Sequence, residues 1–347
     1  MTAPVINEDI LRVCKTLSNF KSKIENKRFL ITGGAGFLGS WICDVLNSFN
    51  AKIICVDNFS SSSSKNINHL IGKEDFIFLE KNVLDFEIDE DIDYIIHMAS
   101  IASPPLYQKH PIETLDANIL GTKKMLELAK EKLAKAFLLT STSEVYGNPP
   151  DESVPTSENY YGIVNSFGPR SMYDEGKRAS EAYCYSFFKN FKLPIRIARI
   201  FNTYGPRLDV KNTSQYGRVV AKFIQQAVEG KSVTVYGDGS QTRSFCYITD
   251  QMIGLIKLLL ADGLDGQVVN IGNEEEVTIL DLAKKIISLT NSKSEIVFHE
   301  LPPDDPRRRC PNISKAKELL GFKPQIDIEQ GLMKTICWFK KEGISGS

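Results

Sequence analysis

The chain has 347 residues, of which 42% are hydrophobic and 24% charged, with a formal net charge of −1 at pH 7. Such a balanced charge gives no electrostatic reason to bind nucleic acid or an anionic membrane, so we expect neither partner. No uninterrupted apolar run reaches the roughly 20 residues that a membrane-spanning helix needs. The seven cysteines contain no CxxC pair, which argues against a metal site and favours a reducing, cytoplasmic location.

The first 27 residues are predicted to form an N-terminal helical extension. Ile10, Val13, Leu17 and Phe20 are spaced for one face of a helix. We expect this apolar face to dock on the body of the protein or on another subunit.

Residues 28–205 alternate between short apolar runs and longer segments with helical periodicity. Continuous β-branched and aromatic runs are typical of strands that are covered on both faces. The pattern therefore predicts an α/β protein with a Rossmann-type, doubly wound parallel sheet. The predicted strands are 28–32, 52–57, 76–80, 93–99, 135–142 and 195–201, and the clearest helices are 38–49 and 112–133.

Residues 206–347 have a different pattern of predicted secondary structure, because glycine and proline divide them into shorter elements. We interpret them mainly as a smaller C-terminal α/β region, within which 268–273 is a candidate strand that returns to the sheet. A helix is predicted within 277–289, with Thr278 as its N-cap and Asp281 three residues later.

A glycine-rich turn follows the first predicted strand in "FLITGGAGFLGSWI". Gly33 allows a tight turn, Gly36 allows the backbone to approach a pyrophosphate, and Gly39 allows close helix packing. Asp57 ends the second predicted strand and would accept hydrogen bonds from the adenosine ribose hydroxyls. This spacing predicts a dinucleotide site that favours NAD over NADP, because the carboxylate would repel a 2′-phosphate.

The stretch "SMYDEGKR" places Tyr173 and Lys177 one helical turn apart. On its own the pair fits a solvated helix face. In combination with the glycine-rich turn it suggests a catalytic tyrosine. A free tyrosine has a pKa near 10 and is a poor base at pH 7, but a nearby ammonium and a cationic nicotinamide would both lower this pKa by favouring the phenolate.

The lone His97, within a strand-like run, is interpreted as a packed residue.

Polar side chains gather where the fifth predicted strand ends, in "LLTSTSEVYG". Ligands of doubly wound sheets bind at the carboxyl ends of the strands. Thr142, Ser143 and Glu144 are therefore candidates for the site, although threonine and serine are also ordinary residues of strands and turns.

The glycine spacing and the YxxxK pair resemble the extended short-chain dehydrogenase/reductase family. The stretches "STSEVYG", "GPRSMYDEGKR" and "VYGDGSQTRSFCYITD" are most similar to its UDP-glucuronate decarboxylases, also called UDP-xylose synthases. The resemblance covers about residues 28–340 and implies that 206–347 mainly bind the nucleotide sugar. Asn82 departs from the aspartate that many relatives place near the adenine.

The resemblance implies a role for each of the following groups of residues. The catalytic group is Tyr173, Lys177, Thr142, Glu144 and Arg243. The NAD-binding group is Gly33, Gly36, Phe37, Leu38, Asp57, Asn58, Ala99, Ser100 and Asn118, together with Tyr173 and Lys177. The substrate-binding group is Ser143, Asn202, Arg218, Val219, Tyr236, Gln241, Arg243 and Arg307.

The activity implied is NAD-dependent decarboxylation of UDP-glucuronate to UDP-xylose through a 4-keto intermediate, in a homodimer. Tyr173 would take the 4-hydroxyl proton, and Glu144, Arg243 or water would protonate C5. A 4-epimerase, a C4 dehydrogenase or a 4,6-dehydratase are alternatives, although Ser143 replaces the aspartate that protonates the leaving hydroxyl in dehydratases. An NAD-sensing binding protein is the non-enzymatic alternative. The sequence leaves open the exact nucleotide and sugar, and whether the ketone is reduced or released.

Overall fold

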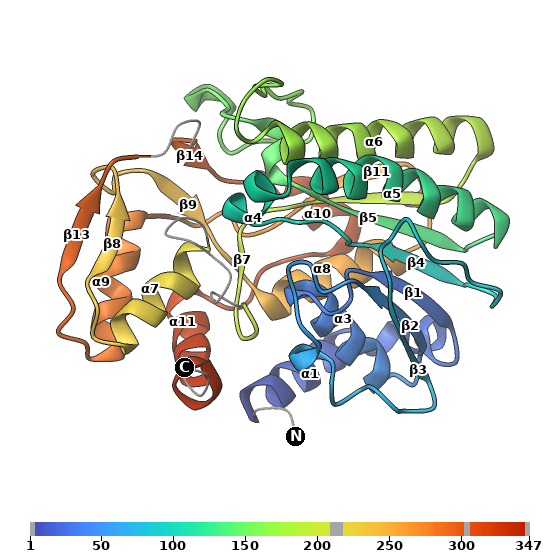
Figure 1. Ribbon diagram of the computed structural model, residues 1–347, viewed down its shortest axis with the longest axis horizontal. Helices are drawn as coiled ribbons and strands as arrows, with labels where there is room; N and C mark the ends of the chain where they lie inside the picture. Colours follow the sequence, from blue (N-terminus) through green and yellow to red (C-terminus); the bar gives the residue numbers. More distant parts are fainter. Residues whose placement is uncertain (1–3, 209–217, 302–305, 344–347) are drawn as a thin grey trace.

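The computed structural model describes residues 4–208, 218–301 and 306–343. These residues form a central parallel sheet of seven strands with helices on both faces (Figure 1). The fold is the predicted Rossmann-type doubly wound sheet. In their order across the sheet the strands are β11 (Gln267–Ile271), β6 (Ile195–Ile200), β5 (Ala136–Thr142), β4 (Tyr94–His97), β1 (Arg28–Thr32), β2 (Lys52–Asp57) and β3 (Phe76–Glu80).

Helices cover both faces of this sheet, and an apolar core lies under each set. One core joins the sheet to helices such as α3 and α8 and contains Trp41 and Met252. The other lies under α5 and α6 and contains Leu126 and Cys184. The longer helices are α1 (Pro4–Thr16), α3 (Phe37–Ser48), α5 (Pro111–Glu131), α6 (Ser171–Phe191), α7 (Val219–Val228), α8 (Ile248–Leu260), α9 (Ile279–Thr290) and α11 (Ile328–Trp338), and the shorter ones are α2 (Lys21–Ile24), α4 (Pro104–Lys109) and α10 (Ser314–Leu320).

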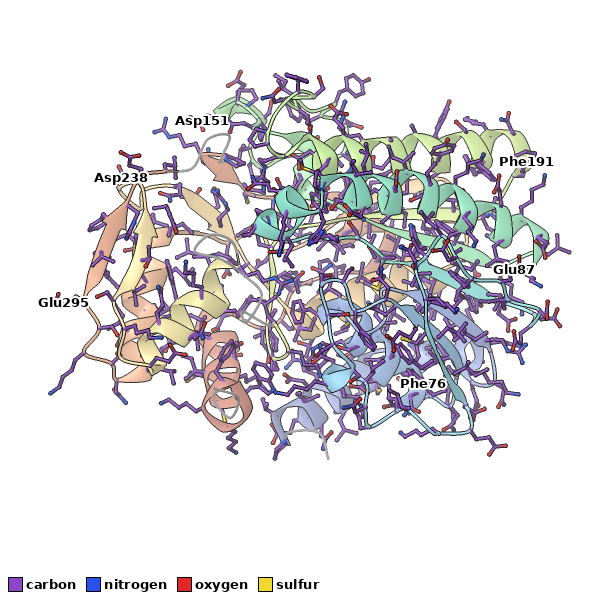
Figure 2. The ribbon with its side chains drawn as sticks, in the orientation of Figure 1. Phe76, Glu87, Asp151, Phe191, Asp238 and Glu295 are labelled. Atoms are coloured by element: carbon purple, nitrogen blue, oxygen red, sulfur yellow. The ribbon has the colours of Figure 1, made fainter. Side chains whose placement is uncertain are left out.

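A smaller layer of strands and helices stands beside one end of the sheet. It contains β8 and β13, which pair with each other, and the helices α7 and α9 (Figure 1). Phe191 at the end of α6 and Asp238 in the turn after β8 lie at opposite ends of the molecule (Figure 2). The remaining short strands are β7 (Thr203–Tyr204), β8 (Val233–Tyr236), β9 (Thr242–Ser244), β10 (Cys246–Tyr247), β12 (Glu276–Thr278), β13 (Ile296–His299) and β14 (Arg308–Arg309).

The chain returns to the large sheet through β11, which pairs with β6. The division of the chain at residue 205 stays a prediction. In α9 the hydroxyl of Thr278 accepts a hydrogen bond from the amide of Asp281 at 3.0 Å, which is the predicted N-cap. β4 is shorter than the predicted run 93–99. After His97 the amide of Met98 still donates to the backbone carbonyl of Thr32 at 3.0 Å, whereas the amide of Ala99 turns to the hydroxyl of Thr32 at 3.3 Å.

The N-terminal helix α1 docks on the body of the same chain. Val13 and the following Leu17 are fully buried. Asp9, also buried, accepts hydrogen bonds from the Tyr247 hydroxyl at 2.6 Å and from the Lys334 ammonium at 2.8 Å. These contacts tie the extension to β10 and α11. Across the described ranges, no helix combines the length and apolar character needed to cross a bilayer.

Candidate active site

The carboxyl ends of the sheet strands open into a cavity of about 520 Å³. This volume is in the range of small-molecule and cofactor sites. Among the residues predicted to bind NAD or to act in catalysis, those that line it are Gly33, Gly36, Phe37, Leu38, Asp57, Asn58, Ala99, Ser100, Thr142, Glu144, Tyr173 and Lys177. Ser143, predicted to bind the substrate, lines it as well.

The glycine-rich turn has the geometry that a pyrophosphate site requires. Gly33 has φ +73°, and a Cβ there would lie 2.9 Å from the amide nitrogen of Ala99. Gly36 is the residue before α3, so the N-terminus of that helix faces the cavity. A Cβ on Gly39 would lie 2.3 Å from the Gly33 carbonyl oxygen, which explains the close packing of helix and turn. The turn therefore fits the diphosphate of NAD.

Two polar groups in the same cavity also fit NAD. Asp57 ends β2, and its carboxylate is oriented by the amide of Ala35 at 3.0 Å and the hydroxyl of Ser62 at 2.8 Å. The Ser100 hydroxyl is buried without a hydrogen-bond partner among the residues that the structure describes. An unpaired buried hydroxyl is costly, and a ligand in this cavity would satisfy it.

Tyr173 and Lys177 are buried, with 8% and 4% of their surface exposed. The solvated-face interpretation of this pair is therefore excluded. The Lys177 ammonium donates to the carbonyl of Thr140 at 2.9 Å, and Tyr173 is hydrogen-bonded to the Thr142 side chain. Both side chains thus stand beside the carboxyl-terminal half of β5.

Burial dominates the electrostatics of this pair. It lowers the pKa of Lys177 to about 8 and raises the pKa of Tyr173 above its usual value, against the hydrogen bond from Thr142. The protein groups alone therefore keep the phenol protonated. The Lys177 ammonium was expected to lower the pKa of Tyr173, but it is not among the main groups that shift this pKa. A lower pKa therefore needs a further positive charge near Tyr173.

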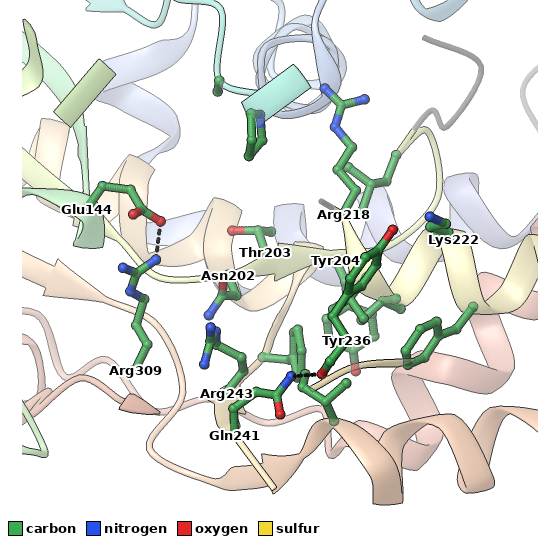
Figure 3. Close-up of a pocket in the computed structure, with 18 of the residues that line it drawn as sticks. Glu144, Asn202, Thr203, Tyr204, Arg218, Lys222, Tyr236, Gln241, Arg243 and Arg309 are labelled. Atoms are coloured by element: carbon green, nitrogen blue, oxygen red, sulfur yellow. Dashed lines mark hydrogen bonds and ion pairs between the residues drawn. The ribbon is translucent and has the colours of Figure 1, made fainter. Parts of the chain in front are cut away.

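A second cavity, of about 270 Å³, adjoins the first and extends toward α7 and β8 (Figure 3). Tyr173, Glu144 and Asn202 line both cavities, so a ligand in one can meet a ligand in the other at these side chains. The predicted substrate-binding residues that line the second cavity are Asn202, Arg218, Val219, Tyr236, Gln241 and Arg243.

Glu144 forms ion pairs with two arginines that the sequence interpretation did not include. Arg170 pairs with one carboxylate oxygen and Arg309 with the other, and Figure 3 shows the second contact. Burial alone would raise the pKa of Glu144, but the charges of Arg309 and Arg170 outweigh it and lower the pKa to about 2. Glu144 is therefore a carboxylate at neutral pH.

Asp174 shares Arg170 with Glu144, at 3.5 Å from the guanidinium Nε. Burial and the charge of Glu144 raise the pKa of Asp174 to about 7. Tyr107 of α4 is a further residue that the sequence did not indicate. It is buried and lines the second cavity, and within the described part of the chain its hydroxyl has no hydrogen-bond partner.

Two predicted site residues lie elsewhere. Arg307 is exposed and does not line either cavity, whereas Arg309 does. Asn118 is buried in α5 beside Gly176 of α6, where a Cβ on the glycine would meet its side chain at 3.1 Å. Their proposed ligand contacts stay predictions.

His97 is packed in β4, between the hydroxyls of Thr32 at 2.7 Å and Thr122 at 3.1 Å. Burial and the charge of Lys177 lower its pKa to about 3, so it is a neutral packed residue as interpreted from the sequence. Within the ranges that the structure describes, no three His, Cys, Asp or Glu side chains are grouped so as to hold a metal ion.

Comparison with known proteins identifies the family. The model of the NAD dependent epimerase/dehydratase family matches residues 29–272. UDP-glucuronic acid decarboxylase 1 of Danio rerio is 47% identical over 323 residues, which are 93% of this chain and 75% of that protein. UDP-glucuronic acid decarboxylase 3 of Arabidopsis thaliana is 44% identical over 91% of this chain and 90% of that protein.

Solved structures agree with this assignment. UDP-glucuronic acid 4-epimerase from Bacillus cereus, in complex with UDP-glucuronic acid and NAD, superposes with a TM-score of 0.81 at 30% identity, covering 90% of this chain and 99% of that one. Epimerase Mth375 from Methanothermobacter thermautotrophicus superposes with a TM-score of 0.86 at 28% identity, covering 94% and 95%. The chain therefore belongs to the NAD dependent epimerase/dehydratase family, and within it is similar to the UDP-glucuronic acid decarboxylases.

Proposed function

We propose that this protein is an NAD-dependent enzyme that decarboxylates UDP-glucuronate to UDP-xylose through a 4-keto intermediate. The observation that carries the proposal is 41–47% identity, over at least 90% of the chain, to UDP-glucuronic acid decarboxylases of fish, frog and plant. The two adjoining cavities support it, because the chemistry needs a cofactor and a nucleotide sugar that meet at one tyrosine.

The glycine-rich turn with Gly33 and Gly36 would hold the NAD diphosphate, Asp57 the adenosine ribose, and Lys177 the nicotinamide side. NAD⁺ held there would supply the acceptor for the hydride of sugar C4, the donor that returns it at the end of turnover, and a positive charge near Tyr173. That charge favours the phenolate, which burial alone disfavours. The hydroxyl of Tyr173 then takes the proton from the 4-hydroxyl of the sugar.

Carbon dioxide leaves because the C6 carboxylate is β to the C4 ketone. The electron pair of the C5–C6 bond moves into an enolate, and Tyr173 and Thr142 donate hydrogen bonds to its oxygen. Glu144 is held ionised by Arg170 and Arg309, so it does not hold a proton of its own to give. We propose that Glu144 orients a water molecule that gives a proton to C5, and that the hydroxide left behind combines with the released CO2 as bicarbonate. Tyr173 returns its proton to the sugar O4 when the C4 ketone is reduced.

The test is to incubate the purified protein with UDP-glucuronate and to measure the mass and the sugar configuration of the product. We expect the loss of one CO2 and a product that co-migrates with UDP-xylose. Persistence of an unreduced 4-keto pentose would limit the proposal to oxidation and decarboxylation. An unchanged substrate would contradict it.

A second function, 4-epimerisation of UDP-glucuronate, is favoured by one observation. The UDP-glucuronic acid 4-epimerase of Bacillus cereus shares the fold over 90% of this chain. Epimerisation leaves the mass unchanged and inverts C4, so the same experiment separates it from decarboxylation.

We also propose that the enzyme is a homodimer joined through α5 and α6, which pack side by side. Ile112 and Leu115 of α5 and Tyr185 of α6 are exposed apolar residues on this layer. Replacing Ile112 and Leu115 by lysine should halve the mass measured by light scattering, whereas Leu133→Lys, in the loop after α5, should not. We propose the cytoplasm as the compartment, on the cysteine pattern of the sequence.

A further inference from the structure

Lys222 stands at the end of the second cavity that is remote from the reacting groups. In Figure 3, Glu144 and Lys222 lie at opposite sides of the pocket. Lys222 belongs to the first turn of α7, and its ammonium lies 5.6 Å from the centroid of the Tyr236 ring. Both side chains line the cavity.

The ammonium of Lys222 has no hydrogen bond or ion pair to any residue that the structure describes. Its recorded contact is the face of Tyr236. The side chain is half-buried, and burial lowers its pKa without an acidic neighbour to oppose the effect. A cation in the first turn of a helix is also not favoured by the helix dipole. Apart from the cation–π contact with Tyr236, the described part of the fold gives no structural reason for a lysine here.

An ammonium offers three donors and no acceptor, so its partner must carry acceptor oxygens. The sugar must lie at the other end of the cavity, beside Tyr173 and Glu144, if the proposed chemistry is to occur. The far end, at Lys222 and Tyr236, is then left for the nucleotide.

We propose that Lys222 is a specificity residue that donates a hydrogen bond to an acceptor oxygen of the uridine diphosphate half of the substrate, beside the ring of Tyr236. This inference rests on the proposed function in taking a nucleotide sugar as the substrate. Two sources share the required chemistry, a carbonyl oxygen of uracil and an oxygen of the diphosphate.

The test is titration calorimetry of UDP and of uridine with the full-length wild-type protein and with Lys222→Met and Lys222→Gln. We expect Lys222→Met to weaken UDP binding by about 10- to 100-fold, the size of a hydrogen bond to a charged group. If the partner is a uracil carbonyl, uridine binding weakens as well and Lys222→Gln restores part of it. If the partner is a phosphate, uridine binding is unchanged and the loss for UDP shrinks at high salt.

Lys231→Met is the matched control, because Lys231 is an exposed lysine after the same helix and pairs with Glu229 at 2.8 Å. We expect it to bind UDP like the wild type. UDP binding by Lys222→Met at wild-type affinity would overturn the inference, whatever the turnover. A wild-type protein that binds UDP through Lys222 but releases no CO2 from UDP-glucuronate would instead refute the proposed function alone.

Discussion

The ring of Tyr107 lies flat against the ring of Tyr173, with centroids 5.4 Å apart and planes that differ by 4°. With Ile101 these two tyrosines form a small apolar cluster that is separate from the two main cores. The stack comes from different elements, α4 and α6, and it fixes the plane of the proposed catalytic phenol. In Tyr173→Phe the aromatic ring would therefore keep the position that it has in the wild type.

Tyr173→Phe should remove only the hydroxyl. We expect turnover of UDP-glucuronate to fall by at least about 100-fold, the lower range for a lost general acid–base group, while bound NAD and the free energy of unfolding stay near wild type. Product formation and the NAD content of the purified variant are the measurements. Turnover close to wild type would show that Tyr173 is not the acid–base group.

Arg309 and Arg307 are two residues apart and should behave differently. Arg309 holds Glu144 in the substrate cavity, whereas Arg307 is exposed. We expect Arg309→Met to lower kcat by roughly 10- to 100-fold, because a buried carboxylate loses one of its two charged partners. Arg307→Met should change kcat and KM less than about two-fold. A large loss of kcat or rise in KM for Arg307→Met, with no change for Arg309→Met, would support Arg307 as the substrate-binding residue, as the sequence predicts.

The sequence predicted the sheet because its strands are continuous apolar runs, and β1, β2 and β3 begin and end where those runs do. It also predicted residues at strand ends, such as Thr142 and Asp57, because the fold class places ligands there. The partners of Glu144 were not predictable in this way. Arg170 and Arg309 are 26 and 165 residues away in the chain, and only the pairing of β14 with β9 decides which arginine of three enters the cavity.

The alternation of side chains along β14 separates the roles of Arg308 and Arg309. Arg308 points to Glu276, with a 2.6 Å ion pair, while Arg309 points to Glu144. Successive residues of a strand face opposite sides, so a one-residue change in register would exchange their roles. Nothing in the local sequence fixes that register.

Gly36 and Gly39 should separate cofactor binding from folding. Gly36 has φ −68°, which alanine adopts readily, and a Cβ there would meet only the Gly33 carbonyl oxygen at 3.2 Å. We expect Gly36→Ala to fold normally but to bind NAD at least about 10-fold more weakly, because the methyl group stands where the backbone must approach the diphosphate. Urea unfolding and NAD titration are the measurements.

Gly39→Ala is the counterpart. Its Cβ would lie 2.3 Å from the Gly33 oxygen and 2.7 Å from the Gly34 Cα, so the backbone must shift, at a cost of about 1–3 kcal/mol. We expect a lower free energy of unfolding for this variant. Wild-type NAD affinity in Gly36→Ala would show that the diphosphate does not sit on this turn.

Asp174 should make the stability of the protein depend on pH. Its folded-state pKa of about 7 lies above the ordinary value of 3.8, so between these pH values the folded protein holds a proton that the unfolded chain has released. The stability that this proton provides is present at low pH and is lost as the pH rises through 7. Above pH 7 two carboxylates, Asp174 and Glu144, share Arg170.

Asp174→Asn removes the second negative charge. We expect the free energy of unfolding of this variant, minus that of the wild type, to be larger at pH 8 than at pH 5 by on the order of 1 kcal/mol. The variant thus gains stability over the wild type as the pH rises, which urea unfolding at both pH values measures. Asp75→Asn, at an exposed aspartate, should run parallel to the wild type. If Asp174→Asn also runs parallel, then Asp174 is already ionised at pH 5 in the folded protein, and Arg170 accommodates both carboxylates without the conflict that their burial implies.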